Sequence, residues 1–212
     1  MRSSFCAVLT ALLIFTGVSL AAPEPAVVQG PNLWTLNIQF TNPQFIEMPS
    51  LAGSKPIRYW YMIITLTNNS NRDVDFYPKC DLVTDTFQTI TAGIDVGTMV
   101  FNRIKDIYKS KYPFLEQFGA SDNKMLQGQD NTRDIAVIWK DFDPNANNIK
   151  IFITGLSNET AEVSYPAANG QDEEAKKIYL RKTLELQYKI RGNPASNTGA
   201  VLDYVNKTWV MR

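Results

Sequence analysis

The chain has 212 residues, with 21 basic and 21 acidic side chains and no histidine. Its balanced charge provides no overall field that would steer it towards nucleic acid or an anionic membrane. The lack of histidine excludes hydrolase triads of the usual kind, and it excludes zinc or haem sites that need an imidazole ligand. The sequence has no glycine-rich phosphate loop, and therefore predicts no nucleotide cofactor.

The first 21 residues predict a secretory signal peptide. Arg2 supplies the positive start, residues 5–20 form the apolar run, and a small-residue cleavage site ends at Ala21. The apolar run is short for a bilayer span, so we expect cleavage after Ala21 and no membrane insertion of the mature protein. The expected location is outside the cytoplasm, either secreted or periplasmic.

Cleavage would leave Cys80 as the one cysteine of the mature chain. A secreted domain with one cysteine has no internal disulfide, so its stability must come from core packing. We expect Cys80 to be a small buried apolar residue, with an intermolecular disulfide as the alternative.

The composition also predicts how the chain is divided. Residues 22–31 are rich in proline and alanine and predict a flexible tether. Residues 32–212 are long enough for a single domain with a sizeable core. The first strand of that domain is predicted at residues 33–40, where apolar and polar side chains alternate.

The stretch from Lys55 to Thr86 predicts a long strand, a polar turn and a shorter return strand. Both faces of the long strand are apolar at its middle, so we expect either a cover on both sides or a partner on one of them. One face carries Trp60, Met62, Ile64 and Leu66, and the other carries Tyr59, Tyr61, Ile63 and Thr65. The run from Asn68 to Asn71 favours a hairpin connection to the return strand.

The periodicity becomes that of an amphipathic helix between residues 96 and 111. Its apolar positions are Val100, Ile104, Ile107 and Tyr108, and Asp95 precedes it as a candidate cap. We expect this helix to lie over an apolar sheet surface, with the Tyr59 face of the long strand as the first candidate. A helix on a membrane surface is the alternative, although the segment carries only four basic residues.

The second half of the chain predicts further strands. Residues 112–133 form a long connection, and strands at 134–141 and 149–154 then make a second hairpin. Residues 158–176 are polar and predict a solvated loop. The clearest alternation runs from Ile178 to Ile190, and the last strand runs from Tyr204 to Met211.

These elements together predict a mainly β fold. Seven or eight short strands without alternating helices are typical of an immunoglobulin-like β-sandwich, here with one amphipathic helix inserted. A hairpin with so much apolar area requires a second sheet to cover it.

Acidic side chains supply the candidates for metal binding and for acid–base chemistry. Residues 141–145 begin like a calcium loop, but Ala146 and Phe152 stand where that loop needs glycine and glutamate. We therefore interpret Asp143-Pro144-Asn145 as a turn and predict no metal site. Asp81 with Asp85, and Glu173 with Glu174, are candidate carboxylate pairs, but solvated turns and loops would place them equally well.

Five apolar and aromatic residues form the candidate interaction surface. Tyr59, Tyr61 and Ile63 give the long strand its second apolar face, and Phe114 and Phe118 begin the long connection after the helix. Such a group is typical either of a binding platform or of core packing under a cover, and the sequence leaves both open.

Three sequence blocks carry a resemblance to a known family. They are TLTNNSNRDVDFYPKCDLVTDT, DIAVIWKDFDPNANNIKIFITGLSN, and RKTLELQYKI followed by the terminal TWVMR. From about Ile57 to Arg212 the chain resembles a family of uncharacterised secreted proteins of planctomycete-type bacteria. Phe87 departs from the family pattern, in which a glycine usually follows the LVTDT block. The general layout is also similar to immunoglobulin-like modules of bacterial envelope proteins, and the resemblance implies a fold but no activity.

The sequence thus leads to a functional hypothesis without a catalytic residue. We expect a non-enzymatic envelope protein that uses no cofactor and binds another protein or a surface polymer, but not nucleic acid. A hydrolase or accessory enzyme that works with carboxylates is the alternative, and it would require two close, buried acidic side chains in a cleft.

Overall fold

The computed structural model describes residues 25–50, 55–119, 123–165, 176–192 and 200–212. The predicted signal peptide and the Glu173–Glu174 pair lie outside these residues. No helix in the described ranges is long and apolar enough to cross a bilayer.

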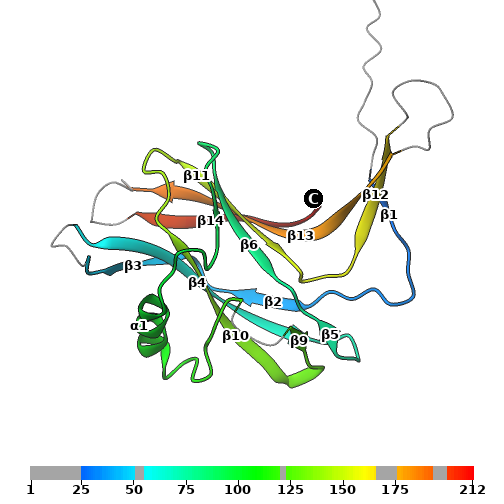
Figure 1. Ribbon diagram of the computed structural model, residues 1–212, viewed down its shortest axis with the longest axis horizontal. Coiled ribbons are helices and arrows are strands. Elements are labelled where there is room, and N and C mark those ends of the chain that lie inside the picture. Colours follow the sequence, from blue (N-terminus) through cyan, green and yellow to red (C-terminus); the bar gives the residue numbers. More distant parts are fainter. Residues whose placement is uncertain (1–24, 51–54, 120–122, 166–175, 193–199) are drawn as a thin grey trace, which may run out of the picture.

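Two sheets face each other across one core (Figure 1). The five-stranded sheet has the order β2-β4-β10-β8, and β3 pairs with β4 alongside β2. Its strands are β2 (Asn37–Phe40), β3 (Gln44–Met48), β4 (Ile57–Asn68), β8 (Glu116–Gln117) and β10 (Gly128–Lys140).

The seven-stranded sheet has the order β1-β12-β13-β11-β6-β7, and β14 pairs with the free edge of β13. Its strands are β1 (Ala26–Val27), β6 (Lys79–Thr84), β7 (Thr89–Thr91), β11 (Asn148–Thr154), β12 (Thr160–Tyr165), β13 (Lys176–Arg191) and β14 (Val201–Met211). A small separate pair joins β5 (Val74–Asp75) to β9 (Lys124–Met125).

The mainly β, sandwich-like fold with one inserted helix is confirmed. The number of strands is larger than the seven or eight expected, because the chain adds several strands of two or three residues. Strands that short are held by a few backbone hydrogen bonds and leave no alternating pattern in the sequence. The long strands are the predicted ones, and they bury Trp60, Trp139 and Leu184 between the sheets.

Both predicted hairpins are wrong in the same way. After β4 the chain crosses to the other sheet, where β6 pairs with β11 and β7, and after β10 it crosses again to β11. The two edges of β4 are already occupied by β10 on one side and by β2 and β3 on the other, so no return strand can pair there. Asn68 shapes the first crossing, because its buried amide donates to the carbonyls of Arg72 and Met125 at 2.8 Å each.

The helix α1 (Thr98–Tyr108) covers the outer face of the five-stranded sheet (Figure 1). Val100 and Ile104 are buried against Tyr59, Tyr61 and Ile63, which confirms the predicted packing. Residues Ile46, Leu115, Ala136 and Ile138 complete this second apolar cluster.

Two details of the helix differ from expectation. Gly97, and not Asp95, occupies the cap position, and no side chain caps the helix. Asp95 instead has a left-handed backbone with φ 56° and pairs with Lys140. Ile107, one of the four predicted apolar contacts, remains half exposed.

An arm projects from the sandwich body (Figure 1). It consists of β1, β12 and the first part of β13, because Lys176–Arg181 pairs with β12 whereas the following residues pair with β11 and β14. The flexible-tether prediction is therefore wrong for Ala26 and Val27, whose backbone extends the open edge of β12. The solvated-loop prediction is wrong for residues 160–165, which form β12 itself.

Candidate functional site

The predicted interaction surface does not exist as one exposed patch. Tyr59, Tyr61 and Ile63 lie under α1, and Phe118 closes the margin of the core, where its backbone amide donates to the Ala136 carbonyl at 3.0 Å. Among these five residues only Phe114 is exposed, with 85% of its surface open to solvent. A cover over apolar side chains stabilises the fold, and this explains why the face is buried instead of open for a partner.

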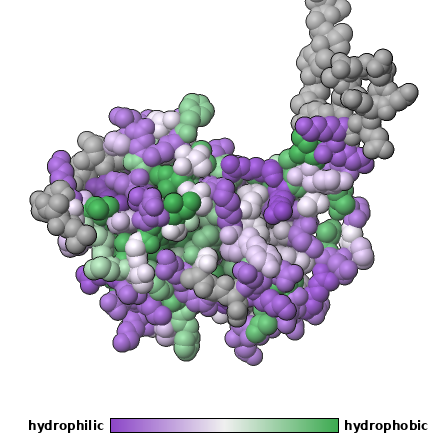
Figure 2. Space-filling view, viewed as in Figure 1, coloured by the Kyte–Doolittle hydropathy of each residue, from purple (hydrophilic) through white to green (hydrophobic). Residues whose placement is uncertain are grey.

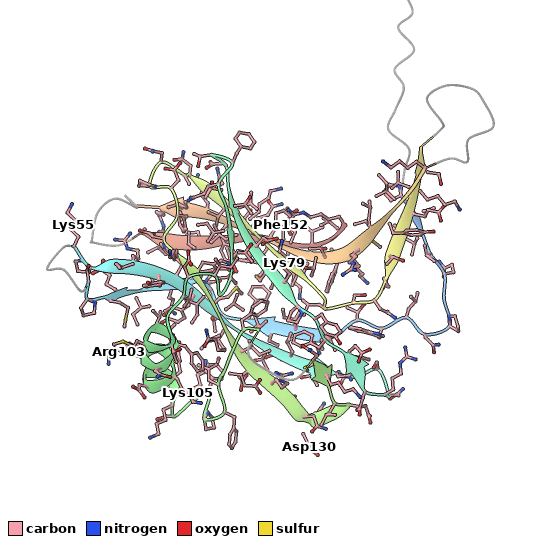
Figure 3. All side chains as sticks on the ribbon, in the orientation of Figure 1. Lys55, Lys79, Arg103, Lys105, Asp130 and Phe152 are labelled. Carbon is pink, nitrogen blue, oxygen red and sulfur yellow. The ribbon has the colours of Figure 1, made fainter. Side chains whose placement is uncertain are left out.

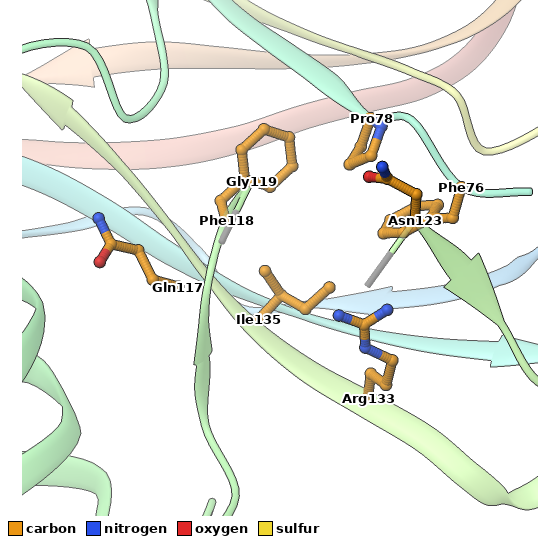
Figure 4. Close-up of a pocket in the computed structure, with 8 residues that line it drawn as sticks. All are labelled: Phe76, Pro78, Gln117, Phe118, Gly119, Asn123, Arg133 and Ile135. Atoms are coloured by element: carbon orange, nitrogen blue, oxygen red, sulfur yellow. The ribbon is translucent and has the colours of Figure 1, made fainter. Parts of the chain in front are cut away.

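Phe118 also lines a small pocket at the margin of the sandwich (Figure 4). The pocket has a volume of about 20 Å³, enough for roughly one water molecule. Arg133 crosses this pocket and is engaged by Glu116, with the closest contact at 2.5 Å, and by the carbonyl of Lys124 at 3.1 Å. This pocket is therefore a small packing gap, and the Arg133 side chain extends across it.

A larger groove lies at the root of the arm, where β12 and β13 leave the body. It has a volume of about 280 Å³, close to the lower end of the range for small-ligand sites. We call it the arm-root groove. It is lined by Trp34, Asp75, Tyr77, Gly155, Ser157, Asn158, Glu159, Thr160 and Arg181. The surface around the root of the arm is mostly hydrophilic (Figure 2).

Backbone contacts among three segments, at residues 34–36, 77 and 155–158, fix the frame of the arm-root groove. The segment before β2 pairs with the end of β11, through Leu36 N to Leu156 O at 2.8 Å and Asn158 N to Trp34 O at 3.2 Å. Gly155 has φ +85°, and a Cβ there would stand 2.5 Å from the Tyr77 carbonyl oxygen, so only glycine fits. This close approach holds Tyr77 against the turn that starts the arm.

An ion pair supports the floor of the groove. Lys182 and Glu159 lie 2.5 Å apart with both side chains mostly shielded, and Glu159 also accepts a hydrogen bond from Thr35 Oγ1 at 2.9 Å. The hydrogen bond from Lys182 is the main reason that the pKa of Glu159 lies below its usual value. The Ser157 hydroxyl is also hydrogen-bonded within the protein, because it donates to the Trp34 carbonyl at 2.9 Å.

Three side chains that line the groove are not engaged by other residues of the described ranges. Asp75, Tyr77 and Arg181 make no side-chain hydrogen bond or ion pair with any residue in the described ranges. Tyr77 is 66% exposed, and Trp34 presents a half-buried indole beside it. The groove thus combines a free carboxylate, a free guanidinium and two aromatic rings on a rigid backbone, which is a set of groups for binding a polar ligand.

The acidic candidates from the sequence have structural roles. Asp81 pairs with Lys79 at 2.9 Å and accepts from Thr91 Oγ1 at 2.7 Å, and Asp85 accepts from the backbone amides of Asn147 and Asn148 at 3.1 Å each. Asp81 and Asp85 therefore hold the β6–β7 hairpin in place and do not converge on one reacting atom.

The most shielded carboxylates, those of Asp81 and Glu185, also fail to form a pair. Both lie opposite Phe152 in the register of β6, β11 and β13, so two interstrand spacings of about 10 Å in total separate them. The side chain of Phe152 stands between the two positions, with Arg212 stacked 4.0 Å from its ring centroid.

The predicted turn at residues 141–145 is observed. Asp143 Oδ1 accepts from the backbone amide of Asn145 at 2.9 Å, and Asp141 Oδ1 accepts from Trp60 Nε1 at 2.8 Å. In the described ranges no group of three or more Cys, Asp or Glu side chains is arranged to hold a metal ion.

Cys80 is buried with a free thiol on β6. Burial is the main cause that raises the pKa of this thiol, and the neighbouring Asp81 acts in the same direction. A thiol that stays protonated inside the core reacts slowly, which agrees with the first of the two predicted roles.

Comparison with known proteins gives no relative for this chain: no protein-family model, no curated protein and no solved structure matches it. Function must therefore be inferred from the residues of the arm-root groove. The arm-root groove was missed by sequence reasoning, because its residues come from four separate places between Trp34 and Arg181. Gly155 at the end of a strand was the one local signal, since an isolated glycine there indicates a close backbone approach.

Proposed function

We propose that the protein is a non-enzymatic envelope protein, secreted or periplasmic, whose arm-root groove binds a hydroxyl-rich surface polymer. The proposal rests on three side chains of the groove, Asp75, Tyr77 and Arg181, that have no hydrogen-bond or ion-pair partner among the described residues. They lie on a backbone frame fixed by Gly155. Preorganised polar groups beside aromatic rings bind without the cost of ordering the site first.

The chemistry of the groove favours a glycan over other occupants. A carboxylate accepts hydrogen bonds from hydroxyl groups, a guanidinium donates to hydroxyl and ring oxygens, and aromatic faces pack against the C–H face of a sugar ring. The volume suits a single unit of a chain, and the open groove lets the rest of the polymer continue past it. A segment of another protein is the competing occupant.

The strand order supports a relationship to immunoglobulin-like binding modules. Strands β2, β4 and β10 are consecutive neighbours in one sheet, and β6, β11 and β13 are consecutive neighbours in the other, where β14 is an additional strand beside β13. In chain order this corresponds to strands A, B and E facing strands C, F and G of the immunoglobulin sandwich, with α1 in the place of strand D.

The location outside the cytoplasm depends on the signal peptide that the sequence predicts. The intact mass of the protein released by its host tests this part. We expect a chain that begins at Ala22, and retention of residues 1–21 would contradict it.

Binding to polymers tests the groove. The protein is incubated with insoluble peptidoglycan, cellulose and chitin, and soluble oligosaccharides of each are titrated by calorimetry. We expect one class to bind, and Tyr77→Ala or Arg181→Ala to weaken that binding about tenfold or more, as loss of a central contact does. Phe87→Ala and Lys189→Ala are matched controls, because both residues are exposed but lie outside the groove.

Three results would count against the proposal. The first is a lack of binding to every polymer, and the second is binding that Tyr77→Ala and Arg181→Ala leave unchanged. The third is release of new reducing ends from a bound polymer, which would mean that the protein is an enzyme.

A further inference from the structure

The outward side of α1 and the turn after it carry a cationic and apolar surface. We call this the α1 surface and define it by the residues Met99, Arg103, Lys105, Ile107, Lys109, Lys111 and Phe114. Four of the 21 basic side chains of the chain lie between Thr98 and Phe114, and only one of the 21 acidic ones, Asp106. A chain without net charge therefore concentrates positive charge at one place.

The basic side chains of the α1 surface are not neutralised by the protein. None of the four makes an ion pair with a residue of the described ranges. Arg103 and Lys105 project from α1 away from the sandwich (Figure 3). Lys105 and Lys111 instead extend over the rings of Phe101 and Tyr112, at 5.8 Å and 5.0 Å from the centroids.

Large apolar side chains stand among these cations. Met99 is 76% exposed and Phe114 85% exposed, and Ile107 is half exposed. Met99, Arg103 and Ile107 follow one another at intervals of four residues, so they lie along one side of the helix. Val100 and Ile104 lie on the adjacent side of the helix and are buried on the sheet, whereas Met99 and Ile107 stay largely open to solvent at the edge of that contact and are not needed for the core.

We infer that the α1 surface docks the protein onto an anionic phospholipid bilayer. Basic side chains are attracted by the negative surface potential of the lipid headgroups, and the apolar side chains between them enter the boundary between headgroups and acyl chains. A soluble polyanion would match the cations but would leave Met99, Ile107 and Phe114 in water. A bilayer, in contrast, accepts protruding apolar side chains without a preformed pocket.

This docking is peripheral. Only solvent-facing side chains of α1 and of the turn after it reach the bilayer, and α1 keeps its contact with Tyr59 and Tyr61. The arm-root groove contains none of the residues of the α1 surface, so it remains available to a polymer while the protein is docked.

Vesicle sedimentation tests the inference with the secreted protein, whose amino terminus is first verified by mass. The probes are phosphatidylcholine vesicles and vesicles with about a third phosphatidylglycerol, a content that gives a negative surface potential. We expect binding to the anionic vesicles alone, and release in about 1 M salt, where the screening length falls to about 3 Å.

Two double variants separate the charged from the apolar contribution. Arg103→Glu with Lys109→Glu should weaken vesicle binding more than about tenfold, because each basic residue near the surface accounts for about fivefold. Met99→Ser with Phe114→Ser should weaken it about tenfold or more by removing apolar contact. The controls are Phe87→Ser, and Lys55→Glu with Lys189→Glu, which change exposed residues of the same kinds elsewhere.

The outcome decides between bilayer and polyanion. Loss of binding in both double variants but in neither control, with melting temperatures unchanged, supports the inference. A lack of binding to anionic vesicles overturns it. Binding that the charge variant abolishes but Met99→Ser with Phe114→Ser leaves intact also overturns it, and would assign the α1 surface to a soluble acidic polymer such as polyglutamate.

Discussion

The outer faces of the two sheets are constructed in opposite ways. On the five-stranded sheet the outer face is apolar, with Tyr59, Tyr61 and Ile63 buried under α1. On the seven-stranded sheet the outer face is mostly polar, no helix of the described residues lies over it, and the structure places Lys79 and Phe152 there (Figure 3). The acidic side chains of this open face are paired with lysines of neighbouring positions, Asp81 with Lys79 and Glu185 with Lys150.

The difference follows from what each strand contributes to its outer side. An apolar outer face must be covered, since each large side chain removed from water stabilises the fold by about 1.5 to 3 kcal/mol. A polar outer face needs no cover if its charges are paired. The two surfaces that we propose as binding sites are at the margins: the α1 surface on the outward side of the covering helix, and the arm-root groove at the root of the arm.

The largest expected effect comes from breaking the covered face. Ile104 is fully buried in α1 against the sheet. Ile104→Ala should lower the free energy of unfolding by about 2 to 5 kcal/mol, as truncation in a core does. Ile104→Asp should prevent folding, because a charge would be buried without a partner. Urea unfolding measures both, and an unchanged stability of Ile104→Asp would mean that α1 is not a cover.

A smaller effect is expected on the open face. Glu185 is well shielded, lies 3.0 Å from Lys150 and accepts from Gln187 Nε2 at 2.5 Å. Glu185→Ala should cost about 1 kcal/mol, the upper end of the range for an ion pair with one exposed partner. Lys150 remains half exposed and can be hydrated in the variant, unlike a charge placed at Ile104. A loss of stability as large as that of Ile104→Ala would contradict the contrast between the two faces.

The covered face was predictable and the crossings between sheets were not. Tyr59, Tyr61 and Ile63 alternate with Trp60 and Met62, so the pattern predicted either a cover on each side or a partner on one of them. The choice between a hairpin and a crossing at Asn68 depends on which strand occupies the free edge of β4, and that strand, β10, begins 60 residues later in the chain. Local turn chemistry carries no information about such a partner.

The same reasoning explains the outcome at the two candidate sites. Phe114 could be proposed from the sequence because an exposed aromatic residue after a helix is a local feature. The arm-root groove could not, because it exists only where the end of β11 is clamped by the segment before β2. The arm itself was hidden, because β12 lies in a polar stretch whose pattern resembles that of a loop.

Acid should weaken the floor of the groove at the end of the open face. The pKa of Glu159 is lowered by Lys182, so the carboxylate contributes stability that is present above its unfolded pKa of about 4.3 and is lost as the pH falls through the folded value. Glu159→Gln should cost about 1 kcal/mol at neutral pH. Chemical unfolding between neutral pH and about pH 3 should show this cost disappear on acidification. A cost that is constant with pH would mean that the ion pair does not contribute.

The smallest expected effect is that of calcium on the turn at residues 141–145, which connects β10 of one sheet to β11 of the other. A bound ion that ignores the unfolded chain would add about 2.7 kcal/mol at a hundredfold excess over its dissociation constant. We expect no such gain, because one oxygen of each carboxylate is already engaged: Asp141 Oδ1 accepts from Trp60 Nε1, and Asp143 Oδ1 accepts from the backbone and side-chain amides of Asn145 at 2.9 and 3.0 Å. A calcium ion needs six to eight oxygens, and it would have to displace these donors. The melting temperature should therefore stay the same in millimolar calcium.

A clear rise that Asp143→Asn abolishes would contradict this prediction. Asparagine can still accept the hydrogen bonds of the turn, but it lacks the charge that a cation requires.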